Sequence, residues 1–205
     1  MSRIPFLYPV LWMLLLNSSH AQECMHTNLS YKFNYNLKLS RKKNGDNGHG
    51  TGEVTLSIYK KNSVLIQTVN FEAPFLFEGV FGNCHNVRSH VTEYNKDNTV
   101  ADFDFGDLIV ADLNFDGKED FAVKYDSGGN GGPSYRFYIQ DSNGSFKLDR
   151  FLTSNVGSFP EYINAMRRTL TTHINANGKT KNEKTYKYYP KTKKWRMIKW
   201  DDSPD

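Results

Sequence analysis

The chain has 205 residues, and its 26 basic and 22 acidic side chains leave a formal net charge of +4. That balance is too small to indicate a nucleic-acid partner. Aromatic residues make up 14% of the chain, with 12 tyrosines and 14 phenylalanines, and this content favours β-structure.

Residues 1–21 predict a secretory signal peptide. One early positive charge precedes the apolar run 6–16, and the small residues Ser19 and Ala21 follow it two positions apart. A short apolar run with a small-x-small exit is typical of a cleaved export signal. The run is too short to cross a bilayer, and no later stretch is long enough. We therefore expect residues 22–205 to be one exported domain, periplasmic or secreted, with no membrane span after cleavage.

The sequence contains two cysteines, Cys24 and Cys84. In an oxidising compartment an even pair of cysteines indicates a disulfide bond. Such a bond would tie the start of the mature chain to its middle.

The first half of the chain contains several alternating segments. Apolar and polar side chains alternate strictly over residues 31–39, which predicts a half-buried strand. The runs 53–59 and 64–71 are separated by a short polar turn, and this arrangement predicts a β-hairpin. Residues 87–94 alternate more weakly.

The second half continues this pattern. Short apolar runs at 108–110 and 121–125 predict strands on either side of a polar loop. Asn143 and Gly144 lie between the runs 135–140 and 145–152, and an Asn-Gly pair in that position is a strong hairpin signal.

The last fifty residues predict one short helix and a closing hairpin. Apolar residues between 160 and 172 fall at helical spacing, and an extended segment is the alternative there. The runs 185–189 and 195–200 flank a turn. The fold class predicted is therefore mainly β. We expect a predominantly antiparallel sandwich or barrel-like single domain with at most one short helix.

Residues 112–120 read D-x-N-x-D-G-x-x-D, with a glycine at the sixth place where the chain must turn sharply. Oxygen-bearing side chains at this spacing suit calcium, which takes six to eight oxygen ligands. Val123 occupies the twelfth place, where an EF-hand needs a glutamate, so we predict a structural calcium loop between strands. The predicted ligands are the side chains of Asp112, Asn114, Asp116 and Asp120 and the carbonyl of Lys118.

Three further acidic residues, Asp102, Asp104 and Asp107, lie just upstream of this loop. They are candidates for an additional ligand. The alternative for the whole loop is an acidic β-turn, because Asp, Asn and Gly also favour turns. Three carboxylates in one turn would repel one another without a cation, which favours the calcium interpretation.

A glycine-dense loop follows and ends in an aromatic residue. We predict that the calcium loop braces this second loop and that the second loop binds a protein partner. Glycines allow close backbone approach, and a hydroxyl and an aromatic ring suit a carboxylate-lined sugar cleft. Tyr135 lies either in this site or in the core, because strand alternation buries one of Tyr135 and Arg136. The candidate partner-binding residues are Ser127, Gly128, Gly129, Asn130, Gly131, Gly132 and Tyr135.

Residues 112–123, 128–135 and the hairpin that follows resemble a family of exported bacterial proteins. Its members are similar to periplasmic inhibitors of invertebrate-type lysozyme and include immunity proteins against peptidoglycan-cleaving toxins of type IV secretion systems. The metal loop by itself also resembles FG-GAP-type and dockerin-type calcium loops. The family resemblance implies a β-rich inhibitor with bound Ca2+ and a loop inserted into the active site of a lysozyme-like peptidoglycan hydrolase.

Two other classes of function are alternatives to inhibition. The FG-GAP-like loop suggests a calcium-braced adhesion or surface-interaction module, although such modules usually repeat and this loop occurs once. Catalysis is disfavoured, because the chain has neither a G-x-S-x-G nor an H-E-x-x-H motif and its two cysteines are predicted to be bridged. We therefore expect a binding protein and not an enzyme.

Overall fold

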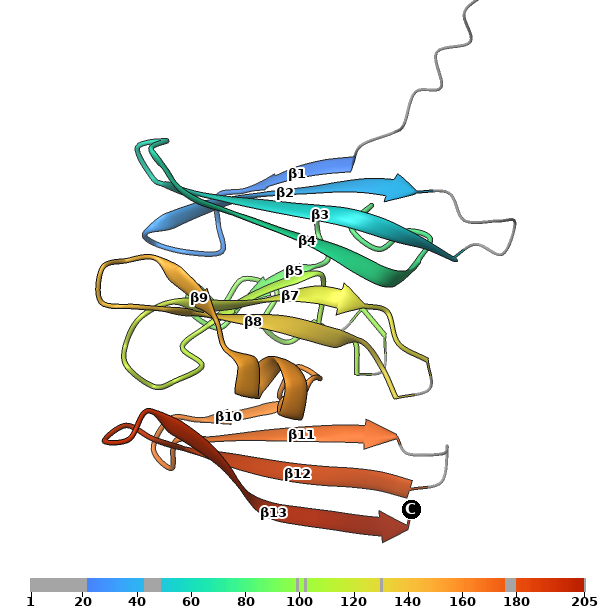
Figure 1. Ribbon diagram of the computed structural model, residues 1–205, viewed down its shortest axis with the longest axis vertical. Helices are drawn as coiled ribbons and strands as arrows, with labels where there is room; N and C mark the ends of the chain where they lie inside the picture. Colours follow the sequence, from blue (N-terminus) through green and yellow to red (C-terminus); the bar gives the residue numbers. More distant parts are fainter. Residues whose placement is uncertain are drawn as a thin grey trace, which may run out of the picture.

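The computed structural model describes residues 22–42, 49–98, 100–101, 103–129, 131–175 and 180–204. The predicted signal peptide, Asp102 and Asn130 lie outside that part of the chain. The described chain is mainly β, as predicted. Its strands form a nine-stranded sheet and a separate four-stranded sheet, and they stack as three layers along the long axis of the molecule (Figure 1).

The first layer is an antiparallel meander that confirms the predicted strand and hairpin of the first half. It consists of β1 (Gln22–His26), β2 (Phe33–Lys42), β3 (His49–Lys60) and β4 (Leu65–Phe77). The hairpin of β3 and β4 is longer than the alternating runs that predicted it. Alternation along these strands buries one face, and Leu37, Leu39 and Leu56 are among its inward side chains.

The middle layer contains β5 (Val87–Ser89), β6 (Leu108–Ala111), β7 (Asp120–Asp126), β8 (Ser134–Gln140) and β9 (Phe146–Leu148). Strand β5 runs parallel to β6, and the other pairs within this layer are antiparallel. The Asn-Gly hairpin is confirmed, although its second strand ends at Leu148. A parallel bridge between Phe75 and Asp126 joins this layer to the first.

The third layer is an antiparallel sheet of β10 (Tyr162–Asn164), β11 (Thr169–Asn175), β12 (Thr180–Tyr189) and β13 (Lys194–Pro204). It confirms the closing hairpin, which extends beyond the runs that predicted it. A short π-helix, Leu152–Val156, connects the middle layer to this sheet. Among the described residues, no helix has the length and apolar character needed to cross a membrane.

The helix predicted over residues 160–172 is wrong. The segment forms β10, a turn and β11, with Ile163 opposite Leu170 in the antiparallel register. The side chain of Asn164 accepts a hydrogen bond from the Arg167 amide at 2.9 Å and so stabilises the turn. Met166 is at the turn and is 95% exposed, so the helical spacing of apolar residues was coincidental.

Two hydrophobic cores lie on opposite faces of the middle layer. In β6, Leu108 and Val110 belong to the core shared with β2–β4, whereas Ile109 and Ala111 belong to the core shared with the third layer. Strand β7 alternates in the same way. Because both faces are covered, these strands have continuous apolar runs instead of a polar face.

The predicted disulfide between Cys24 and Cys84 is present, with a sequence separation of 60 residues. It joins β1 to the turns that precede β5. In the chain-entropy model, closing a loop of this length stabilises the native state by about 4 kcal/mol.

Candidate functional site

The two loops predicted to carry function lie at opposite ends of β7 (Figure 1). Residues 112–119 connect β6 to β7, and residues 127–133 connect β7 to β8. The strand has seven residues, which separates the loops by about 20 Å. The expectation that the metal loop directly braces the glycine loop is therefore wrong.

Side chains of the metal loop fold back and accept hydrogen bonds from the backbone amides of the same loop. A carboxylate oxygen of Asp112 and the amide oxygen of Asn114 each accept a hydrogen bond from the Asp116 amide at 3.0 Å. The other oxygen of Asp112 accepts from the Gly117 amide at 2.9 Å, and Gly117 has a φ of +79°. Oxygens from the first and third places thus converge on the sharp turn that the glycine allows.

Asp120 closes the loop from inside the protein. Its side chain has no solvent exposure, and one oxygen accepts from the amides of Leu113 and Asn114 at 2.9 and 3.2 Å. The second oxygen accepts from the Gln140 amide at 2.9 Å. Burial raises the pKa of Asp120 to about 8, and it also raises the pKa of Asp112.

The fifth and seventh places of the loop face outward. Asp116 is exposed and accepts a hydrogen bond from the Lys118 amide at 2.9 Å. The Lys118 ammonium lies 3.5 Å from the Asp116 carboxylate and 3.3 Å from the Asp141 carbonyl oxygen. In the part of the chain that the structure describes, no three His, Cys, Asp or Glu side chains gather as a metal-holding group. A cation here would therefore depend on the Asn114 amide and backbone carbonyls as well as on the carboxylates.

Asp104 and Asp107, which were candidates for an additional ligand, lie away from this loop. The ammonium of Lys124, near the far end of β7, is 2.8 Å from Asp104 and 2.9 Å from Asp107. Asp107 also accepts from the Phe81 amide at 2.8 Å. These carboxylates therefore belong to a buried ion network and not to the metal loop. The signal in the sequence was a lysine inside the apolar run of β7.

The glycine loop has a tight conformation that excludes side chains at its base. Gly128 has a φ of +62°, and a Cβ built there would lie 1.9 Å from the Gly132 carbonyl oxygen. The amide of Gly132 donates to the carbonyl of Gly129 at 3.1 Å, and the amide of Gly128 donates to Asp126 at 2.6 Å. Gly129 is exposed, with open space where a Cβ would lie. The loop therefore presents the exposed backbone of Gly129 beside a closed base.

The structure corrects the roles predicted for the two side chains that flank these glycines. Tyr135 has no solvent exposure, and its hydroxyl donates to the Gly106 carbonyl at 3.0 Å. Ser127 is buried, and its hydroxyl accepts from the Phe77 amide at 2.9 Å. The alternation of β8 turns Tyr135 into the core, so neither side chain faces a partner in this conformation. Both hold the base of the glycine loop.

The base of the loop also contacts other layers. A Cβ at Gly132 would lie 3.1 Å from the Phe103 side chain, and one at Gly131 would lie 3.5 Å from Ile174 in β11. The Tyr135 hydroxyl lies 3.4 Å from a carboxylate oxygen of Asp104. The ion network of Lys124, together with Tyr135, therefore supports the glycine loop in place of the expected calcium brace.

Comparison with protein-family models and with curated proteins finds no match for this sequence. Among solved structures, the fold is similar to one described as "Structure of a Xanthomonas Type IV Secretion System related protein". The two chains are 16% identical, and the similarity covers 92% of this chain and 84% of that one, with a TM-score of 0.61. At this identity the likeness is one of fold.

Proposed function

We propose that this chain is an exported binding protein that inhibits a lysozyme-like peptidoglycan hydrolase by inserting the glycine loop into its active-site cleft. The observation that carries the proposal is the conformation of residues 127–129 and 131–133. A backbone tip at Gly129 stands on a base held by buried side chains. Such a pre-ordered loop loses little conformational entropy on binding.

The backbone is the part of this loop that would contact the hydrolase. Amide and carbonyl groups at the tip can pair with catalytic carboxylates and sugar-binding groups, and the absence of a side chain at Gly129 allows close approach. Ser127 and Tyr135 act as supports for the loop. The fold similarity to a type IV secretion system related protein agrees with a role as an immunity protein.

We further propose that residues 112–120 bind Ca2+ as a structural ion. The residues that would hold it are Asp112, Asn114, Asp116 and Asp120, with the Lys118 carbonyl. The donor set is made of oxygens, which calcium prefers, and three of these side chains already point at the turn of the loop. The ion would neutralise carboxylates that burial leaves poorly solvated.

Binding without catalysis and export from the cytoplasm complete the proposal. The Cys24–Cys84 disulfide supports export, because disulfides persist in oxidising compartments. The proposed target and the disulfide both support a location in the periplasm or outside the cell.

The function is tested by titrating a panel of lysozymes and related peptidoglycan hydrolases with purified residues 22–205. The panel includes invertebrate-type enzymes, and it is read by turbidity loss of cell walls and by gel filtration of the mixtures. We expect stoichiometric inhibition of at least one enzyme and a stable complex with it. Absence of both inhibition and complex formation across the panel would remove the proposal.

A matched pair of variants locates the contact. Gly129→Trp places a large side chain at the open tip and should abolish inhibition while the melting temperature is retained. Ser142→Trp places the same side chain in the exposed β8–β9 turn, at the opposite end of β8, and should inhibit like the natural protein. Equal inhibition by both variants would show that the loop is not the inhibitory element.

A further inference from the structure

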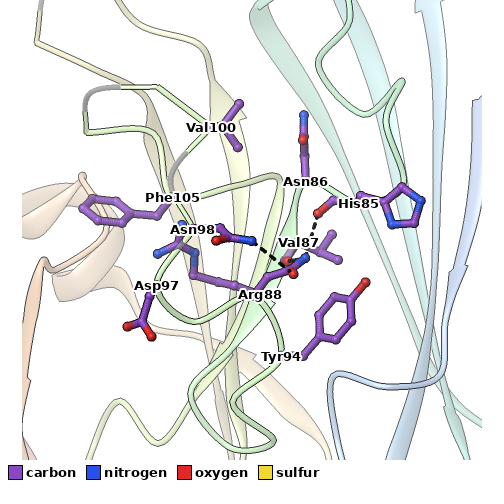
Figure 2. Close-up of a pocket in the computed structure, with 10 residues that line it drawn as sticks. His85, Asn86, Val87, Arg88, Tyr94, Asp97, Asn98, Val100 and Phe105 are labelled. Carbon is purple, nitrogen blue, oxygen red and sulfur yellow. Dashed lines mark hydrogen bonds between the residues drawn. The ribbon is translucent and has the colours of Figure 1, made fainter.

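Beside β5 the surface is hollowed into a pocket of about 690 Å³ (Figure 2). Its walls come from β5, from the turns over residues 94–98 and from the segment around Val100 and Phe105. This volume is within the range of small-molecule sites, which is about 300–1,000 Å³. The pocket shares no residue with the metal loop or the glycine loop.

Arg88 is the buried charged group among the described residues that line this pocket. It is 4% exposed, and its Nη1 donates to the Lys96 carbonyl at 3.2 Å. Its Nε is buried and has no hydrogen-bond partner. Among the described residues, no carboxylate forms an ion pair with it. A guanidinium offers five N–H donors and stays charged in proteins, so this one is under-satisfied.

The position of the guanidinium is fixed by aromatic packing. It lies over the Phe105 ring at 5.1 Å, and Phe105 in turn packs against Phe159 with ring centroids 5.8 Å apart. The side-chain amide of Asn95 donates to the carbonyls of His85 and Val87, each at 3.1 Å, and so holds the turn that precedes β5. The pocket is therefore a built site with a rigid cationic anchor. Burial lowers the pKa of Arg88, and the neighbouring Tyr135, Asp104 and Asp97 act in the opposite direction.

Packing alone does not account for this arrangement. A buried charge without a paired anion costs free energy, and an apolar side chain of the same length would fill the space without that cost. A guanidinium can donate two parallel N–H hydrogen bonds, and the two oxygens of a planar carboxylate are spaced to accept them. The buried Nε of Arg88 lacks an acceptor, which a carboxylate oxygen would supply.

The lining also indicates which anion fits. Besides Arg88, the pocket contains one acidic residue, Asp97, and neutral polar groups such as Asn86, Asn98 and Tyr94. A phosphate carries close to two negative charges, and with Asp97 it would leave the pocket negatively charged. A carboxylate carries one charge, so together with Arg88 and Asp97 it leaves one net negative charge where a phosphate leaves close to two. The amides and the hydroxyl suit a polar body attached to it.

We propose that this pocket binds a small molecule through a carboxylate group, with Arg88 as the anchor and the asparagine amides holding its polar body. Acidic sugars and other hydroxylated carboxylic acids are the ligand class that this lining fits. The inference does not depend on the inhibitor function, because it rests on different residues.

The test uses residues 22–205 and the 1H–15N spectrum, including the side-chain Nε signal of Arg88. The probes are sodium acetate, glucuronate, glucose and inorganic phosphate, each at matched ionic strength with sodium chloride. Acetate and glucuronate should shift the signals of Val87, Arg88 and Phe105 saturably, and glucose and chloride should not. The inference is overturned if neither carboxylate gives a saturable shift there, if glucose binds as well as glucuronate, or if phosphate binds more tightly than both.

Two variants separate a binding role from a structural one. Arg88→Met should abolish the response to acetate while circular dichroism confirms the fold. Asp97→Asn removes a like charge at an exposed position and should tighten acetate binding about threefold. If Arg88→Met does not fold, Asp97→Asn decides, and unchanged or weaker acetate binding by it would contradict the proposal.

Discussion

The ammonium group of Lys124 lies 2.8 Å from a carboxylate oxygen of Asp104, and the lysine side chain is 1% exposed. This contact joins β7 to the segment that lines both the base of the glycine loop and the Arg88 pocket. Asp107 is the second carboxylate of the network and is 2% exposed. The network therefore connects the two surfaces to which function is assigned.

Lys124→Met should destabilise the fold by about 3–5 kcal/mol, because it leaves two carboxylates without their cation in the interior. Urea denaturation measures the change. The matched control is Lys199→Met, which removes an exposed pair with Glu183 at 2.7 Å and should cost less than about 1 kcal/mol. Adding Asp107→Asn to Lys124→Met should recover part of the loss. Equal effects of the two single variants would contradict this view of the network.

Calcium should raise the melting temperature of the natural protein, since an ion at 100 times its Kd stabilises by about 2.7 kcal/mol. Asp116→Ala should remove that rise and leave the melting temperature in chelator nearly unchanged, because Asp116 is exposed. Asp141→Ala, in the neighbouring turn, should retain the calcium response. A chelator that has no effect on the natural protein would end the structural-calcium proposal.

The position of the metal loop adds a second expectation. Because the loops lie at opposite ends of β7, Asp116→Ala should change the affinity for a hydrolase by less than about threefold, roughly 0.65 kcal/mol. Isothermal titration with the inhibited enzyme measures this. A large loss of affinity would show that the two ends are coupled through the strand.

Gly128→Ala should disrupt the glycine loop. The new Cβ would meet the Gly132 carbonyl oxygen at 1.9 Å, at a φ of +62° where alanine is strained. We therefore expect the free energy of unfolding to fall by at least about 1–2 kcal/mol. Inhibition should be lost as well. Gly129→Ala meets nothing within 4 Å and should change stability by less than about 0.5 kcal/mol. Thermal denaturation and the inhibition assay distinguish the two, and identical behaviour would refute the tight-base geometry.

Acid should weaken the fold partly through His26. Burial lowers the pKa of His26 from 6.5 to about 4, with a smaller contribution from His85. Below pH 6.5 the unfolded chain binds a proton at this residue and the folded protein does not. The free energy of unfolding therefore decreases as the pH falls from about 6.5 to about 4. The shift corresponds to at most about 3 kcal/mol. His26→Phe keeps a ring and cannot titrate.

The difference in unfolding free energy between pH 7 and pH 4.5 should therefore be smaller for His26→Phe than for the natural protein. Urea denaturation at both pH values gives the comparison. The same pH dependence in both proteins would exclude His26 as a source of acid sensitivity.

The local elements were largely predictable because their signals are local. Strict alternation predicted β2, and a short polar turn between two runs predicted the β3–β4 hairpin. Asn143 with Gly144 predicted the β8–β9 turn. The predicted helix failed because Ile163 and Leu170, at helical spacing, instead face each other across an antiparallel pair. Periodicity over so short a window does not separate a tight hairpin from a helix.

The site was less predictable because it depends on which ends of the strands meet. The spacing of residues 112–120 identified the loop, but the length of β7 places it far from the glycine loop. Lys124 pairs with carboxylates 17 and 20 residues away, and no local pattern encodes that pairing. Arg88 was missed for the same reason. Its buried Nε without an acceptor becomes visible once the turns around it are assembled.

Strand β7 pairs with β4, β6 and β8, and its first five residues are buried. Such a segment does not unfold locally at a low free-energy cost. Its amides therefore exchange with solvent only when the whole molecule unfolds. The amide protons of Ala122 and Val123 should therefore persist longest in deuterated water. Their exchange rates would report global stability, whereas amides of the glycine loop would report its local opening.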